Sequence, residues 1–141
     1  MKTLVVYYSY SGRSRAVAEK LAKAESLDIA EIKDVRHVSK LKAYTAGIVA
    51  SIKGKPWPIQ PLVVEWLDYT RLILFAPIWA GNPPPAFNAF MEQLPAGKVI
   101  TLKMVSASGT SDCKERMEKA IIEKGCTLET FEDIKIPRKA H

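Results

Sequence analysis

A run of hydroxyl side chains lies where a short apolar segment gives way to a helical pattern. The run is Ser9-Tyr10-Ser11-Gly12-Arg13-Ser14, directly after Leu4-Val5-Val6-Tyr7-Tyr8. Alternate hydroxyls and a glycine let donors converge on one small anion, and the dipole of the following helix adds a positive end. The run matches neither a Walker loop nor the Gly-x-Gly-x-x-Gly dinucleotide loop. It therefore predicts a site for a terminal phosphate monoester; the alternative is an ordinary strand–helix turn with serine capping.

A second segment, Pro77-Ile78-Trp79-Ala80-Gly81-Asn82, joins an apolar run to a helical pattern. A tryptophan in such a loop can present its indole face to a flat heteroaromatic ring. Gly81 can turn the peptide either way without strain at a Cβ. Asn82 is a favourable N-cap, and Pro83 to Pro85 suit a first helical turn. The segment therefore favours an exposed, ring-binding Trp79 over a tryptophan that fills the core.

The elements that must position these loops alternate along the chain. Buried or alternating apolar runs predict strands at Leu4–Tyr8, Leu27–Ile32, Arg71–Ala76, Val99–Val105 and Thr127–Ile136. Apolar residues at helical spacing predict helices at Arg13–Ala24, Lys40–Lys53, a stretch opened by Asn82 and Ser111–Lys124, the last ended by Gly125. Leu62 to Leu67 could form a turn or short helix. Such alternation favours right-handed βαβ units and a parallel sheet with helices on both faces.

Ligands of an open α/β sheet bind beyond the carboxyl ends of its strands, where the winding reverses. Both loops described above follow strands, and so does a third, Ser106-Ala107-Ser108-Gly109. A Ser-Gly turn is common and by itself is weak evidence for a ligand site. Its position after the fourth strand makes that evidence stronger. We therefore expect the three loops to form one site.

These loops resemble those of the flavodoxin family. The stretch from Val5 to Ser14, with Ala18 and Leu21, is similar to the family signature, with Ser14 in place of the usual Thr. Pro77 to Gly81 resembles the Pro-Val-Trp-Ala-Gly loop of short members, and Ser106 to Gly109 matches their loop after strand four. The resemblance covers nearly the whole chain, least clearly from Val35 to Pro61.

The resemblance implies a flavodoxin-like, doubly wound five-stranded parallel sheet of order 2-1-3-4-5 that binds FMN. The first loop would hold the phosphate, Trp79 would lie against the isoalloxazine and Gly81 would face N5. Ser108 and Gly109 would donate to the carbonyl side of the ring. Because the cofactor would supply the chemistry, no acid–base residue is assigned.

Length and composition set the remaining limits. The 141 residues, 48% of them apolar, fit one domain over 1–141 with a short basic tail from about 137. No apolar run approaches the roughly 18 residues of a membrane span, and the apolar start is too short for a signal peptide, so we expect a cytoplasmic protein. The spacing of Cys113 and Cys126, and of His37 and His141, indicates no metal site or redox pair; Cys113 is in register with an apolar helical face.

The net charge of +6 is unevenly distributed. Between Val35 and Val64 there is no acidic residue, and the basic ones are Arg36, Lys40, Lys42, Lys53 and Lys55. This stretch is either a solvated surface or an attractant for an anionic partner, such as NAD(P)H or an acidic redox protein. A recognition helix and an aromatic stacking surface are missing from it, which argues against nucleic-acid binding.

The main functional prediction is an FMN-binding redox protein that transfers electrons. Flavodoxins that act as carriers are typically acidic and often have a second aromatic residue in the third loop, and this chain has neither feature. An FMN-dependent NAD(P)H oxidoreductase acting on quinones or similar acceptors, as monomer or homodimer, therefore stays open. So does a flavin-free module that keeps only the anion site.

Overall fold

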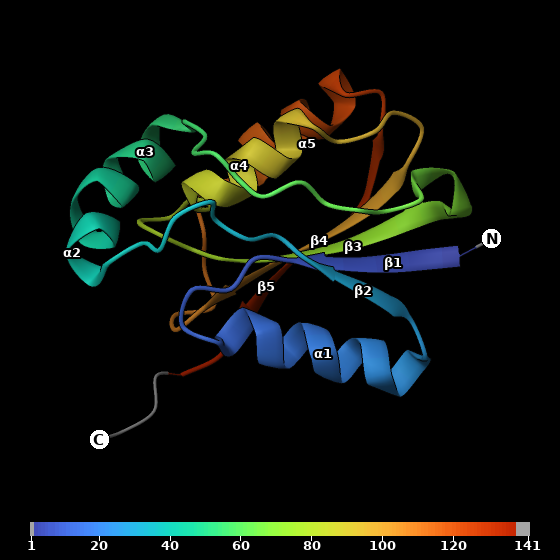
Figure 1. Cartoon of the computed structure of the whole chain (residues 1–141), viewed down its shortest axis with the longest axis horizontal. Helices are drawn as coiled ribbons and strands as arrows, with labels where there is room; N and C mark the ends of the chain where they lie inside the picture. The colour runs from blue at the N-terminus through green and yellow to red at the C-terminus, as the bar shows by residue number, and fades with distance from the viewer. Residues whose placement is uncertain (1, 138–141) are drawn as a thin grey trace.

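The computed structural model describes residues 2–137, and a five-stranded parallel sheet forms its centre (Figure 1). The strands are β1 (Lys2–Tyr7), β2 (Asp28–Glu31), β3 (Tyr69–Pro77), β4 (Val99–Ser106) and β5 (Thr127–Lys135). Their order is β2-β1-β3-β4-β5, and all neighbours are parallel. The winding reverses between β1 and β3, so the crevice for a ligand is expected at their carboxyl ends. The expected fold and strand order are confirmed.

The sheet separates two apolar cores because β1 and β3 are buried on both faces. Val6 and Leu74 point into the larger core, whereas Val5 and Phe75 point into the smaller one. The larger core is closed by α4 (Pro85–Glu92) and α5 (Lys114–Glu123), and the smaller one by α1 (Arg13–Glu25). Figure 1 shows α1 on one side of the sheet and α4 and α5 on the other. Helices therefore cover both faces, as the sequence predicts.

The face that carries α1 becomes polar towards β5. Arg71 on β3 pairs with Glu129 on β5 at 2.6 Å, and Lys103 on β4 pairs with Glu132 at 3.5 Å. These residues alternate along their strands with the apolar side chains of the larger core. Within residues 2–137, α1 is the single helix packed on this face. The ion pairs therefore suit a surface that is left to solvent.

A helical run covers residues 40–53, in agreement with the prediction from Lys40 to Lys53. It consists of one turn of α2 (Lys40–Lys42), a π-helical turn η1 (Ala43–Gly47) and α3 (Ile48–Lys53). Four apolar residues at helical spacing predict it. Of these, Leu41, Tyr44 and Ile52 are exposed and Ile48 is half-buried, whereas the small residues Ala43, Gly47, Ala50 and Ser51 are buried. A Cβ on Gly47 would lie 2.9 Å from Trp79 Cζ3, so only a small residue fits the inner face.

Ser51 fixes this run to the loop after β3. Its buried hydroxyl lies 2.8 Å from the carbonyl of Trp79, 3.0 Å from that of Asn82 and 2.8 Å from that of Pro83. One hydroxyl has one proton, so it donates to these three acceptors in turn or by sharing. Arg116 of α5 adds two bonds, to the carbonyls of Ser51 and Ile52. The run and the loop therefore form one packed unit.

Several element boundaries differ from the sequence-based expectation. Asn82 is not the N-cap of the next helix: it lies in a tight turn, Pro84 is the N-cap, and α4 begins at Pro85. The reason is that Asn82 pairs with Trp79 through the backbone, which holds it outside the helix.

The last helix starts at Lys114 instead of Ser111, with Gly125 at a φ of 77° just beyond its end. The stretch after Pro61 forms a short 3-10 turn, η2 (Trp66–Asp68).

The two cysteines are not joined by a disulfide. Cys113 and Cys126 are free and buried, and burial raises the pKa of the Cys113 thiol. Of the expected basic tail, the part beyond Pro137 lies outside the described residues. The helices within residues 2–137 lack the length and apolarity that a bilayer crossing requires.

The Ser51 contact gives a stability prediction. Replacing Ser51 by Ala should lower the free energy of unfolding by about 1–3 kcal/mol, because three carbonyls lose the buried donor that they share. Thr45→Ala on the same helical run is the matched control, since the Thr45 hydroxyl is exposed and bonds only within the helix. That control should stay within about 0.5 kcal/mol of the parent chain. Denaturant unfolding measures both, and equal losses would show that Ser51 does not anchor the loop.

Candidate functional site

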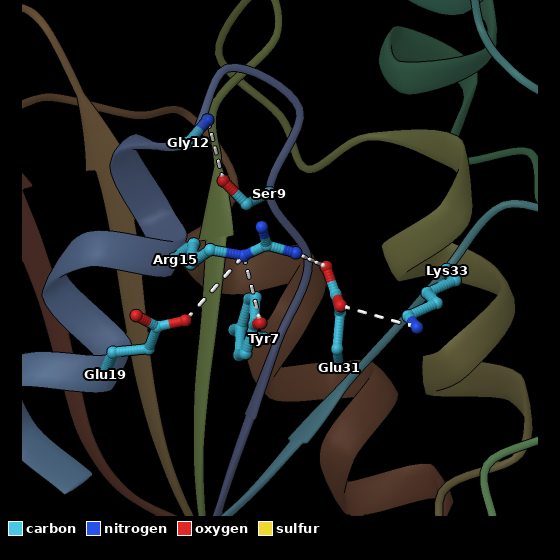
Figure 2. Close-up of polar contacts among 7 residues, drawn as sticks. All are labelled: Tyr7, Ser9, Gly12, Arg15, Glu19, Glu31 and Lys33. Atoms are coloured by element: carbon cyan, nitrogen blue, oxygen red, sulfur yellow. Dashed lines mark hydrogen bonds and ion pairs between the residues drawn. The ribbon is translucent and has the colours of Figure 1, made fainter. Parts of the chain in front are cut away.

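The loop after β1 is a tight turn that leads into α1. Gly12 has a φ of 97°, in the left-handed region that suits glycine, and its amide donates to Ser9 Oγ at 3.1 Å (Figure 2). Arg13 Nε donates to Ser11 Oγ at 3.2 Å. The turn therefore arranges hydroxyls, backbone amides and one guanidinium around the N-terminus of α1, as the sequence predicts. A Cβ on Gly12 would meet nothing within 4 Å, so the space above the turn is open.

Two polar atoms in this turn are buried without a partner. Ser14, on the first turn of α1, is 1% exposed. Among residues 2–137 its Oγ and the Nη1 of Arg13 have no hydrogen-bond partner. Burying such groups unsatisfied costs free energy, so each needs an explanation. An anion at the N-terminus of α1 would supply one acceptor for both.

The neighbouring Arg15 is already neutralised (Figure 2). Its Nε donates to Tyr7 Oη at 3.2 Å, and its guanidinium pairs with Glu31 and, at 3.8 Å, with Glu19. Glu31 also lies 3.8 Å from Lys33 Nζ. This network ties α1 to β1 and β2. Arg13 is therefore the cation of the turn that is left for an anionic ligand.

The loop after β3 folds back on itself. The amide of Trp79 donates to the carbonyl of Asn82 at 2.7 Å, and the amide of Asn82 donates back at 3.1 Å. The two residues between them, Ala80 and Gly81, have φ values of 51° and 84°. Positive φ at both central positions is typical of a type I′ turn. Ala80 is a non-glycine residue in this region, and such strain is often found at ligand-binding sites.

The Trp79 ring lies at the rim of the larger core, half-buried. It contacts Tyr10 of the first loop edge-on, with ring centroids 5.5 Å apart and an interplanar angle of 84°. Tyr10 is fixed in turn because its hydroxyl donates to the carbonyl of Val38 at 2.8 Å. Trp79 therefore packs on the larger core and also contacts the first loop through Tyr10.

The loop after β4 is held by its own hydroxyls. Ser106 Oγ accepts the amide of Gly109 at 2.9 Å, and Ser108 Oγ lies 3.0 Å from Thr110 Oγ1. The amide of Gly109, expected to donate to a ligand, therefore has a partner within its own loop. A Cβ on Gly109 would lie 2.9 Å from the Cβ of Lys135, which explains the glycine. Ala107 lies between these residues, half-buried.

Direct contacts join the three loops into one site. Tyr10 meets Trp79, the amide of Ile78 donates to the carbonyl of Val105 at 3.1 Å, and the amide of Asp112 donates to the carbonyl of Gly81 at 2.8 Å. Pro77 ends β3 and starts the second loop. The expected juxtaposition of the loops is therefore present.

Sequence reasoning did not identify Asp112 or Ser51 as part of this unit. A Cβ on Gly81 would lie 2.5 Å from Asp112 Oδ2, so the carboxylate packs directly on the turn. The five residues after β4 are all small, which is typical of a loop, but this pattern does not indicate that Asp112, the next residue, contacts Gly81. Only the packing of the loops reveals these two contacts.

A hollow of about 260 Å³ opens beside the first loop, over the ends of β1 and β2. Its lining includes Ser9 and Tyr10 and side chains of both signs of charge: Lys33, Arg36 and His37 are basic, and Glu31 and Asp34 are acidic. At its wall the Tyr8 hydroxyl donates to Asp34 Oδ2 at 2.6 Å. Burial raises the pKa of Tyr8 above its usual range and, as the largest effect, also raises that of Asp34. Tyr8 therefore stays a proton donor to Asp34.

No group of three or more His, Cys, Asp or Glu residues between positions 2 and 137 is arranged to hold an ion. The candidate site consists instead of hydroxyls, amides, one arginine and aromatic rings. Such groups suit an organic anion with a flat ring.

Solved structures similar to this one are flavoproteins. A flavoprotein from Lactobacillus acidophilus NCFM, solved in complex with FMN, is 22% identical with a TM-score of 0.73 and covers 92% of this chain and 91% of its own. The apo-form of the flavoprotein from that organism is 20% identical with a TM-score of 0.65, covering 94% and 92%. Oxidised flavodoxin 2 from Bacillus cereus is 19% identical with a TM-score of 0.54, covering 100% and 88%.

At these identities the similarity shows the fold alone. No protein of the curated set matches the chain in sequence. The family model described as flavodoxin matches residues 2–130, which is most of the chain. With its strand order, its turn at the N-terminus of α1 and its tryptophan loop, the chain belongs to the flavodoxin family.

Proposed function

We propose that this chain binds one FMN at the three joined loops and transfers electrons to and from a partner. The observation that carries the proposal is the pair of buried, unsatisfied groups in the first turn, Ser14 Oγ and Arg13 Nη1, within the described residues. A phosphate monoester brings several strong acceptor oxygens and a negative charge. It would satisfy both groups and the dipole of α1 at once.

The phosphate would lie at Ser9 to Ser14. Arg13 would supply the charge because Arg15 is paired with Glu19 and Glu31. The open space above Gly12 supports this position, since the backbone can approach a ligand there without a Cβ between them. The chain therefore fits the phosphate end of FMN.

The isoalloxazine ring would lie at the loops after β3 and β4. Trp79 would contact the ring, and the exposed turn at Ala80 and Gly81 would lie near N5. Ser106 to Gly109 would face the carbonyl side, with Gly109 exchanging its bond to Ser106 Oγ for one to the ligand. When bound, FMN supplies the redox chemistry. The residues of the loops bind it, orient it and set its surroundings.

The hollow beside the first loop favours a second candidate, an FMN-dependent NAD(P)H oxidoreductase that acts on quinones or similar acceptors. Lys33, Arg36 and His37 line the hollow, and it shares Ser9 and Tyr10 with the proposed phosphate site. Two carboxylates line the hollow too, but Glu31 is paired with Lys33 and Asp34 accepts from Tyr8. Arg36 is then the cation that suits an anionic donor such as NADPH.

The phosphate site is tested by Ser14→Ala. The variant should bind FMN about 10- to 100-fold more weakly, because a charge-assisted hydrogen bond is worth about 1.5–3 kcal/mol. Its affinity for riboflavin, which lacks the phosphate, should stay unchanged, and the apo-protein should be no less stable because the hydroxyl has no partner to lose. Flavin fluorescence titration measures both affinities. Equal weakening for FMN and riboflavin would contradict the assignment.

The ring site is tested by Trp79→Ala. Loss of the indole should restore flavin fluorescence and weaken binding by about 1–3 kcal/mol, the range measured for bases stacked on aromatic side chains. Trp66→Ala is the matched control, because Trp66 packs against Phe90 in the larger core. If the Trp66 variant restored fluorescence and the Trp79 variant did not, the ring would lie elsewhere.

The oxidoreductase candidate is tested by steady-state oxidation of NADPH with a quinone acceptor. Arg36→Ala should raise the KM for NADPH about tenfold and leave kcat and FMN content unchanged, because it removes a cation from the hollow but not from the phosphate turn. Arg71→Ala, at a surface ion pair with Glu129, is the control and should leave the KM unchanged. If the FMN-loaded parent chain does not consume NADPH, the enzyme candidate fails and the carrier remains.

A further inference from the structure

The outer face of the helical run 40–53 is apolar. Leu41 is 75% exposed, Tyr44 66%, Ile52 53% and Val49 50%. In an ordinary surface helix the large apolar residues face the core, whereas here the inner face holds alanines, Gly47 and Ser51. The run is therefore amphipathic with its apolar side facing outward. An exposed apolar patch of this kind marks an interaction surface.

The packing beneath the run holds it in this orientation. A Cβ on Gly47 would lie 2.9 Å from Trp79 and 3.4 Å from Trp57, so no larger residue can turn inward there. Ser51 and Arg116 bind the other end of the run to the second loop and to α5. The exposure of the apolar face is therefore built into the fold. In Figure 1 the run lies at the end of the molecule, beyond the strands.

Lysines lie within the same run and just beyond it, and one of them, Lys42, also lies over the ring of Trp57. Lys40, Lys42, Lys53 and Lys55 are exposed, and Arg36 precedes the run. From Val35 to Val64 the sequence has no Asp or Glu. This charge opposes contact with a second copy of the chain, because two such faces would repel each other. It favours an anionic surface.

We propose that the 40–53 face binds the surface of a bilayer that contains anionic lipids. Protein–protein interfaces are depleted in lysine and enriched in arginine and aromatic residues, whereas this face combines aliphatic side chains and one tyrosine with lysines. Helices that lie on membranes have this composition: the apolar side enters the headgroup region, and the lysines contact anionic lipids. Tyr44 suits the same boundary, with an apolar ring and a polar end.

Such binding would place the flavin-type site next to the membrane surface. The inner face of the run contacts Trp79, so one helix, about 10 Å across, would separate the lipid from the second loop. An acceptor dissolved in the membrane could then reach the site. The proposal itself rests on the 40–53 face and does not require that FMN be bound.

Flotation of the full chain with lipid vesicles tests the proposal, with and without added FMN. The protein should float with vesicles of phosphatidylcholine that contain about one third phosphatidylglycerol and not with phosphatidylcholine alone. Added salt should reduce binding, because screening weakens the attraction of the lysines. Flotation of the FMN-free protein tests membrane binding separately. If the chain did not bind FMN, the result for the 40–53 face would still hold.

Two variants locate the contact. Leu41→Asp combined with Ile52→Asp should reduce the partition coefficient at least tenfold, and so should Lys40→Glu with Lys53→Glu. Leu67→Asp is the matched control, since Leu67 is 98% exposed and lies in η2, outside the run; its binding should equal that of the parent. Circular dichroism of each variant checks that the fold is retained.

Three results would overturn the proposal. The first is a parent chain that does not float with anionic vesicles. The second is an equal loss of binding in the Leu67 control. The third is a dimer in size-exclusion chromatography that the Leu41 and Ile52 substitutions dissociate, which would make this face an interface between copies of the chain.

Discussion

The parallel pairing of β3 between β1 and β4 is the constraint on which the rest of the molecule depends. Parallel strands end at the same edge, so the loops after β1, β3 and β4 meet there although they lie far apart in sequence. The order places β1 and β3 at the reversal of winding, with crossovers to opposite faces of the sheet. The turn at Gly12, the turn at Gly81 and the Ser106–Gly109 loop then have to share one space.

Close approach of small residues converts this shared space into a defined site. Gly47 admits Trp79, Gly81 admits Asp112, and Gly109 admits Lys135. In each case a Cβ would lie at 2.9 Å or less from a neighbouring atom, so a larger residue would force the loops apart. The same packing that fixes Trp79 also turns the large residues of the 40–53 run outward. The position of the Trp79 loop and the exposed apolar face of the run therefore both follow from the contact of Gly47 with Trp79.

The charges divide into those that hold the fold and those that do not. Arg15 joins α1 to β2 through Glu31, Arg71 and Lys103 join strands on the polar side of the sheet, and Arg116 binds carbonyls of the 40–53 run. Arg13 bonds only within its own turn, to Ser11, and Lys42 lies over the ring of Trp57. In the contacts of residues 2–137, neither Arg13 nor the lysines of that run form an ion pair. Arg13 and these lysines are therefore the cations available to a ligand or to an anionic surface.

The sequence by itself determined the fold class, the strand order through family resemblance, and the three loops that meet at one edge of the sheet. These follow from local signals: apolar runs that must be buried, glycines and hydroxyls at strand ends, and helical spacing. The extent of the 40–53 run was also readable, because its apolar residues recur at helical spacing whichever way they face.

Only the tertiary structure decided orientation and pairing. The spacing of Leu41, Tyr44 and Ile52 indicates a helix but not that this side faces outward, since that depends on Trp79 lying against Gly47. Asn82 looks like an N-cap until its backbone pairs with Trp79. The roles of Ser51 and Asp112, and the lack of a partner for Ser14 among the described residues, depend on which segments meet in space. Periodicity records local geometry, and contacts between distant segments are set by packing.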